Sequence, residues 1–178
     1  MTMRWLKSFL RDSKGVAAIE FAIVAPAMIT LFAGAWELSQ GMICYLKLLD
    51  AADTVVDITC QQKTLTAANI DDIYTAAQLV MKPNAGNLLG IAVASVKFDA
   101  TTGAAAVDWQ QTRGTATALP NATLTTLANG LGNAGESVII TQVTYNYTSL
   151  LKLVLPGGIK LAANGMQRPR VVPAIPLS

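Results

Sequence analysis

Hydrophobic positions are concentrated near the start of the chain, directly after a short basic segment. Residues 1–15 carry four basic side chains and one acidic side chain, and residues 16–36 then contain a single charge, at Glu20. Helical residues rise about 1.5 Å each, so this apolar stretch extends roughly 31 Å, close to the hydrocarbon thickness of a bilayer, about 30 Å. The pattern predicts a basic leader peptide at 1–15 and a transmembrane helix at 16–36.

The charges on either side of the apolar stretch predict its orientation. Basic residues flank membrane helices on the cytoplasmic side. Here the bases precede the stretch, and the acidic Glu37 follows it. We therefore expect a cytoplasmic N-terminus, a single membrane pass and export of everything after Trp36.

Apolar residues continue beyond this stretch at helical spacing. They are Leu38, Met42, Tyr45, Leu46, Leu49, Ala52 and Val56. Recurrence at three- and four-residue intervals is typical of an amphipathic helix. We therefore expect the membrane helix to continue to about Thr59, which makes 37–62 an amphipathic helical spine.

The remaining pattern mixes helical and strand periodicity. The predicted elements, in chain order, are a helix at 67–81, strands at 91–98 and 104–111, a short helix at 124–128, and strands at 137–147 and 159–167. Thr66 is the expected N-cap of the first of these helices. Four strands with the helices on one side make an exported α+β domain at 63–167. The proline-rich tail at 168–178 is expected to be loose.

Composition and charge exclude several classes of function. The chain is 52% hydrophobic and 13% charged, whereas about a quarter of the residues of a soluble domain are charged. A net charge of +2 provides no basic surface for nucleic acid. The chain has no histidine, so Ser–His and Cys–His nucleophile pairs are excluded. We expect no catalytic residues, metal, cofactor or small-molecule substrate, and therefore no enzyme.

Two cysteines, Cys44 and Cys60, leave two alternatives open. Both fall in the part expected to be exported, where disulfides persist. On one continuous helix they would be separated by about 24 Å, whereas bridged cysteines need Cα atoms within about 7 Å. Either the helix ends before Cys60 and the chain turns back to let them pair, or both are buried free thiols.

The membrane segment has three alternative fates: a signal anchor, a secretory signal peptide cut after Ala35, or a prepilin-type signal cut after Gly15. The small residues at 33–35 fit the secretory cleavage rule. Glu20 favours the prepilin-type signal, because a carboxylate inside a membrane helix costs roughly 2.5–3.5 kcal/mol and needs a partner. The alternative is that the Glu20 side chain snorkels to the inner interface and needs none. Cleavage after Gly15 would free the α-amine of Val16, four residues away on the same helix face.

The residues around this site carry a family resemblance. Lys14, Gly15 and Val16 are followed by an Ile-Glu-Phe-Ala run that contains Glu20 and Phe21. Pro26 then lies within the helix, and Glu37 follows the apolar stretch. This order resembles the N-terminal signature of TadE-like proteins, the pseudopilins of the tight adherence (Flp-type) pilus machinery. The run at 158–170, with its Arg-Pro-Arg ending, is similar to the closing strand of such proteins.

The resemblance implies a fold and a processing event. The fold is α+β and pilin-like, with a long N-terminal membrane-spanning helix that continues into a spine packed on a small, mainly antiparallel sheet. A prepilin peptidase would cut after Gly15, at the Lys14-Gly15-Val16 junction. Glu20, Phe21 and Pro26 would then set the register in which helices associate.

The resemblance also implies partners and a location. The expected partners are the lipid bilayer, a prepilin peptidase, and other pilin or pseudopilin subunits. The protein would lie in a bacterial inner membrane or enter a surface pilus, with a role in pilus assembly, secretion or adhesion. The alternative is a signal-peptide-bearing or signal-anchored extracytoplasmic domain that binds an unknown ligand.

Overall fold

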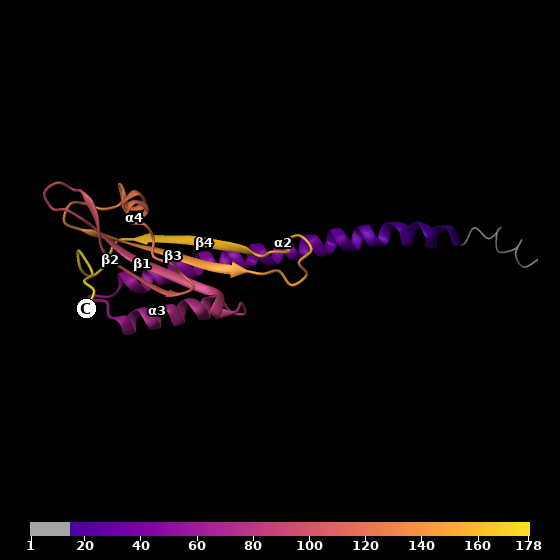
Figure 1. Ribbon diagram of the computed structural model, residues 1–178, viewed down its shortest axis with the longest axis horizontal. Helices are drawn as coiled ribbons and strands as arrows, with labels where there is room; N and C mark the ends of the chain where they lie inside the picture. Colours follow the sequence, from indigo (N-terminus) through magenta and orange to yellow (C-terminus); the bar gives the residue numbers. More distant parts are fainter. Residues whose placement is uncertain (1–14) are drawn as a thin grey trace, which may run out of the picture.

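A helix of 45 residues dominates the computed structural model, which describes residues 15–178 (Figure 1). The elements in chain order are α2 (Val16–Cys60), α3 (Ala67–Val80), the short 3₁₀ helix η2 (Gly86–Leu88), β1 (Leu89–Phe98), β2 (Ala105–Gly114), α4 (Asn121–Ala128), β3 (Ser137–Tyr147) and β4 (Ile159–Gln167). The long helix followed by a small antiparallel sheet confirms the expected α+β class.

The helix α2 runs without a break through the predicted membrane span at 16–36 and into the predicted spine at 37–62. It contains Pro26 without ending there, and the Thr30 hydroxyl donates a hydrogen bond to the Pro26 carbonyl at 2.8 Å. It ends at Cys60, which confirms the expected continuation to about Thr59. Among the described residues, α2 is the helix whose length and apolar composition allow it to cross a membrane.

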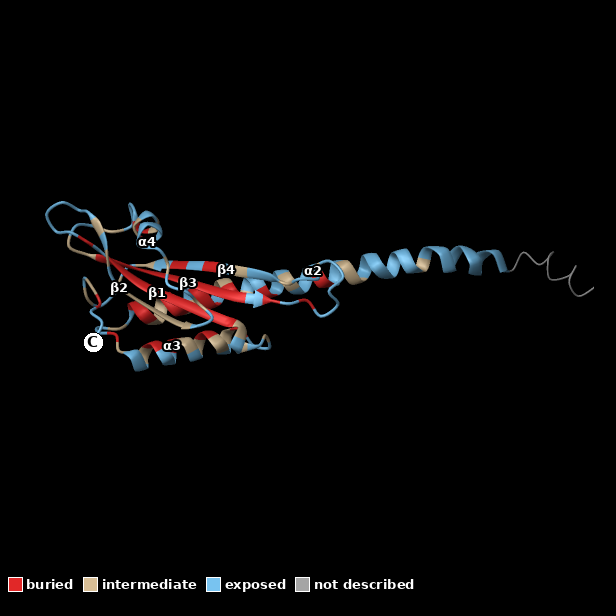
Figure 2. Cartoon of the chain, viewed as in Figure 1, coloured by how far each residue is buried: buried red, intermediate tan, exposed pale blue. Residues whose placement is uncertain are grey.

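Burial divides α2 into two halves. Residues 16–36 project from the domain and none of them is buried, whereas residues 37–60 bury one face (Figure 2). The buried positions in the second half are Glu37, Cys44, Leu48, Ala51, Ala52, Val55, Val56, Thr59 and Cys60. They recur at helical spacing and pack on the sheet and on α3.

The sheet has the strand order β2-β1-β3-β4, and every neighbouring pair is antiparallel. In the two central strands, β1 and β3, successive side chains point to opposite faces of the sheet, and each face has its own cluster of core residues. In β1, Ile91 and Val93 face the cluster that contains α2 and α3, whereas Ala94 and Val96 face the cluster that contains α4. The expectation that the helices lie on one side is therefore wrong for α4, which covers the opposite face near one end of the sheet.

A close approach of backbone to backbone joins α2 to the sheet. A methyl group built on Gly165 of β4 would lie 2.8 Å from both the Ala52 carbonyl oxygen and the Thr141 hydroxyl. That hydroxyl donates a hydrogen bond to the Ala52 carbonyl at 3.3 Å. Small residues at this crossing let the helix lie directly on the strands, so the second half of α2 is an integral part of the domain core.

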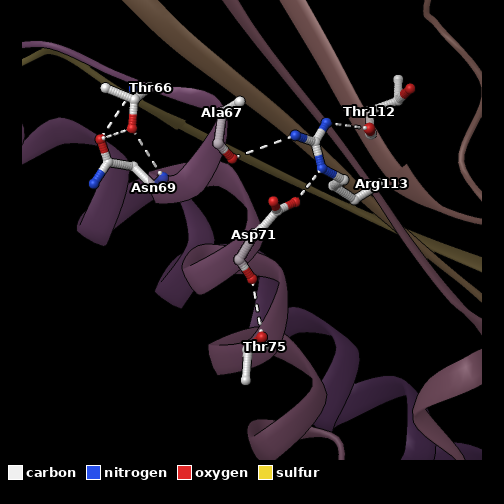
Figure 3. Close-up of polar contacts among 7 residues, drawn as sticks. All are labelled: Thr66, Ala67, Asn69, Asp71, Thr75, Thr112 and Arg113. Atoms are coloured by element: carbon white, nitrogen blue, oxygen red, sulfur yellow. Dashed lines mark hydrogen bonds and ion pairs between the residues drawn. The ribbon is translucent and has the colours of Figure 1, made fainter.

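The helix α3 begins at the N-cap that the sequence predicts. Thr66 and Asn69 form a reciprocal capping box, in which each side chain accepts a hydrogen bond from the other residue's backbone N–H (Figure 3). The Arg113 side chain of β2 pairs with the Asp71 carboxylate and also donates to the Ala67 carbonyl at 3.3 Å. The cap sets where α3 starts, and the ion pair ties the helix to the sheet edge.

The C-terminal tail is docked on the domain, which corrects the expectation that it is loose. Ile175 is fully buried, and its carbonyl accepts a hydrogen bond from the Trp109 indole at 2.7 Å. The Leu65 N–H donates to the Pro176 carbonyl at 2.9 Å. Proline removes N–H donors but leaves every carbonyl free to accept, so a proline-rich segment can still be held through its oxygens.

Candidate functional site

The projecting half of α2 presents an uncovered apolar surface. Its large apolar side chains are each more than half exposed: Val16, Ile19, Phe21, Ile23, Val24, Met28, Ile29, Leu31 and Phe32. Soluble monomers seldom expose a contiguous apolar surface of this extent. The surface therefore requires lipid or other helices around it.

The residues expected to guide processing and assembly lie at the start of this half. Gly15 precedes the first helical residue, Val16, and no side chain caps the helix there. Glu20 and Phe21 follow within the first turns and both are exposed. Lys14 lies outside the described residues. The geometry places Glu20 one helical turn from the position that would become the N-terminus after cleavage.

A second glutamate, Glu37, has the opposite environment and holds a loop of the domain. Its side chain is fully buried. One carboxylate oxygen accepts hydrogen bonds from the N–H groups of Leu153 and Val154, both at 3.0 Å, and the other accepts from Leu155 at 3.2 Å. The preceding residue, Lys152, has a φ of 54°. When a residue in the left-handed conformation lies within a turn, the backbone N–H groups that follow it point toward one place. They then form a concave anion-binding site called a nest.

The charge state of Glu37 follows from these contacts. Burial by itself raises the pKa of Glu37, but the nearby Ser149 hydroxyl and the three backbone N–H groups favour the carboxylate, so the pKa is lowered from 4.5. Glu37 is therefore ionised at neutral pH. It joins α2 to the loop between β3 and β4 at the level where the helix leaves the domain (Figure 1).

The sequence marks Glu37 only as the acidic residue after the apolar stretch. Its position nevertheless belongs to the buried face of α2, seven residues before Cys44 and eleven before Leu48. A carboxylate at a core-facing helical position needs hydrogen-bond donors. The helical spacing from Glu37 to the apolar residues Cys44 and Leu48 is therefore the sequence feature that indicates a buried, hydrogen-bonded carboxylate. Which donors satisfy it depends on a loop more than a hundred residues later.

The two cysteines lie on the same uninterrupted helix, and both are free and buried. The disulfide alternative is therefore wrong, since helical rise separates Cys44 from Cys60 by about 24 Å. Burial raises the pKa of the Cys60 thiol to about 12, and its sulfur lies 3.6 Å from the Gln167 carbonyl oxygen. Both thiols are core residues.

Residues 15–178 contain no candidate metal site. Within that range no three Cys, Asp or Glu side chains gather in a way that could hold a metal ion. A hollow of about 510 Å³ is an open depression beside the β1–β2 hairpin, with Asp99 and Asp108 among its lining residues. The distinctive site of this chain is therefore the helix α2 with its two glutamates.

Residues 15–57 match the TadE-like protein family. The matched segment includes Glu20, Pro26 and Glu37, which confirms the resemblance seen in the sequence. An apolar N-terminal helix together with this family fits a component related to the tight adherence pilus. The similarity expected at 158–170 lies outside the match and stays a prediction. Searches of curated proteins and of solved structures give no match.

Proposed function

We propose that this TadE-like chain is a pseudopilin or minor pilin-like component of a tight adherence pilus assembly and secretion system, with no enzymatic activity. The observation that carries the proposal is the uncovered apolar half of α2, which lies within the segment that matches the family. A helical segment that buries none of its residues in its own domain is suited to lipid and to neighbouring helices.

Processing is the first step of the proposal. A prepilin peptidase removes the leader at 1–15 by cutting after Gly15, and the mature chain begins at Val16. The new α-amine then lies one turn from the Glu20 carboxylate, on the same helix or on a neighbouring one. Neutralising a carboxylate in this way lowers the cost of keeping it among apolar groups.

Lateral association of helices is the second step. Ala18, Ala22 and Ala25 form a stripe of small residues on the uncovered half, and small residues let helices approach closely in lipid. Glu20, with Phe21 and Pro26, sets the register between subunits. The partners are other pilin or pseudopilin subunits.

The proposed location follows from the charges around the helix. Residues 16–36 span a bacterial inner membrane with the N-terminus in the cytoplasm. The spine at 37–62, the α+β domain at 63–167 and the docked tail at 168–178 lie on the exported side. From there the protein serves pilus assembly or enters a surface pilus, where it contributes to adhesion.

The mature N-terminus tests the processing step. N-terminal sequencing of the protein from cells with and without the prepilin peptidase should find Val16 first only when the peptidase is present. Gly15→Leu should block the cut, whereas Ala35→Leu should leave it unchanged. A chain that starts at Trp36 supports the secreted binding domain instead, and an intact leader in all strains supports a plain anchor.

The structure supplies one argument against the secretory cut. The helix α2 is continuous across 33–36, and a methyl group built on Gly34 would lie 3.5 Å from Val154 of the domain. Cleavage after Ala35 would remove Gly34 from its place beside Val154 and leave Glu37 as the second residue of the mature chain.

Glu20 provides the test of assembly. Glu20→Gln keeps the shape of the side chain and removes its charge, so it should be processed after Gly15 but should impair the recovery of subunits in assembled pili. Phe32→Leu, on the same uncovered half, is the matched control and should assemble normally. Full assembly of Glu20→Gln would refute the registry role.

A further inference from the structure

The loop between β3 and β4 exposes a second apolar surface. Its core, 150–155, contains one polar residue, Lys152. The exposed fractions of its apolar side chains are 82% for Leu150, 48% for Leu151, 49% for Leu153 and 44% for Val154. These four large apolar side chains, interrupted only by Lys152, form a patch that water solvates poorly.

The position of this loop relative to α2 identifies what covers it. Its backbone is held to Glu37, the first residue after the apolar stretch, and Val154 lies beside Gly34 within that stretch. The loop therefore lies level with the last turn of the membrane-spanning segment (Figure 1). When 16–36 spans a bilayer, this level is the boundary between hydrocarbon and headgroups on the exported side.

The residues around the patch fit that boundary. Lys152, within the patch, is exposed, and a long cationic side chain can extend from an apolar surface to the polar headgroups. Trp36 is 40% exposed at the same level, and tryptophan is enriched at membrane interfaces. The carboxylate at this level, Glu37, is buried beneath the loop.

We propose that residues 150–154 insert into the exported leaflet of the membrane as a second lipid contact. The inference rests on the span at 16–36, which belongs to the proposed function. The leucine side chains enter the acyl region, and Lys152 stays among the headgroups. Leu155 packs on the domain core, and Glu37 positions the loop. Two lipid contacts fix the orientation of the domain on the membrane.

Lipid-quenching fluorescence on the full chain tests the proposal. Single cysteines that carry an environment-sensitive fluorophore are introduced at Leu150, at Ile29 in the span, and at Thr101, which is exposed in the β1–β2 hairpin. The protein is reconstituted in vesicles of phosphatidylethanolamine and phosphatidylglycerol. Some vesicles also contain phospholipid with a nitroxide near the glycerol end of the acyl chain. The native cysteines are buried, and the unsubstituted chain measures any background labelling.

The expected result is about twofold quenching at Leu150 and at Ile29, with none at Thr101. Quenching at Ile29 but not at Leu150 would overturn the loop insertion and leave the span intact. A probe at Leu150 that neither nitroxide lipid nor aqueous iodide quenches would show that another subunit covers the loop, which also overturns the proposal. Loss of quenching at both positions would overturn the span and the loop together. Glu37→Gln in the Leu150 background should reduce the quenching, because it releases the loop.

Discussion

The two halves of α2 share one helix and an apolar character, yet they have opposite surroundings. None of residues 16–36 is buried, whereas residues 37–60 bury one face against the sheet and α3 (Figure 2). Each half carries a glutamate near its beginning: Glu20 is exposed, and Glu37 is buried beneath three backbone N–H groups. Apolar composition alone therefore does not decide whether a helix is buried in the domain core. Burial depends on which other elements of the chain pack against the helix.

The largest expected effect contrasts two leucines on the same helix. Leu48 is fully buried and Leu31 is 74% exposed. Leu48→Ala should lower the free energy of unfolding of the domain by about 2–5 kcal/mol, because it removes buried methyl groups and leaves a cavity. Leu31→Ala should leave it unchanged. Urea unfolding in detergent, followed by tryptophan fluorescence, measures both, and equal effects would contradict the division of α2.

The next effect contrasts two glycines at contacts of α2 with the domain. A methyl group on Gly165 would clash with the Ala52 carbonyl under the second half, whereas one on Gly34 would make ordinary contact with Val154. Gly165→Ala should lower the unfolding free energy by about 1–3 kcal/mol through overpacking. Gly34→Ala should be neutral. A tolerated Gly165→Ala would mean that the helix can move away from the sheet.

A local effect contrasts the two glutamates. Glu37→Gln removes the charge that draws the N–H groups of 153–155 together, and it should raise their amide hydrogen exchange about tenfold by local opening. Glu20→Gln should leave exchange in this loop unchanged. Hydrogen exchange with mass spectrometry, on the peptide that contains the loop, provides the measurement. Unaltered protection in Glu37→Gln would show that the loop holds without the carboxylate.

The smallest effect is a pH dependence of the same loop. Because the pKa of Glu37 is lowered from 4.5 in the folded protein, its stabilising contribution is complete above that value and is lost as the pH falls through the lowered pKa. Loop exchange, corrected for its intrinsic pH dependence, should therefore be constant near neutrality and rise in acid. Glu37→Gln should abolish the rise, and a rise that persists in this variant would assign it to another group.

Local patterns in the sequence predict most of the elements. The strand at 137–147 has the predicted bounds, and α3 starts after Thr66 as expected. Alternating apolar residues, capping residues and helical spacing all depend on residues that are close together in the chain. These patterns can therefore be seen directly in the sequence. The bounds shift where the signal is weaker: β1 begins at Leu89 and α4 at Asn121, each a few residues earlier than predicted.

Long-range contacts explain the expectations that failed. The tail looks loose because it is rich in proline, but Leu65 and Trp109 hold its carbonyls from elsewhere in the fold. The expected side for α4 is wrong because its apolar residues are compatible with either face of a sheet. The sequence of the tail and of α4 does not indicate which distant residues these segments contact in the folded protein.

The sequence by itself determines that residues 16–36 form an apolar helix long enough to span a bilayer. A long apolar run with a single charge is unfavourable in water whatever fold follows it. The sequence also determines the order of helices and strands. Only the tertiary structure decides which face of α2 becomes core and which loop satisfies Glu37. Those outcomes depend on side chains and N–H groups more than a hundred residues apart, brought together by the pairing of β3 with β4 and their packing on α2.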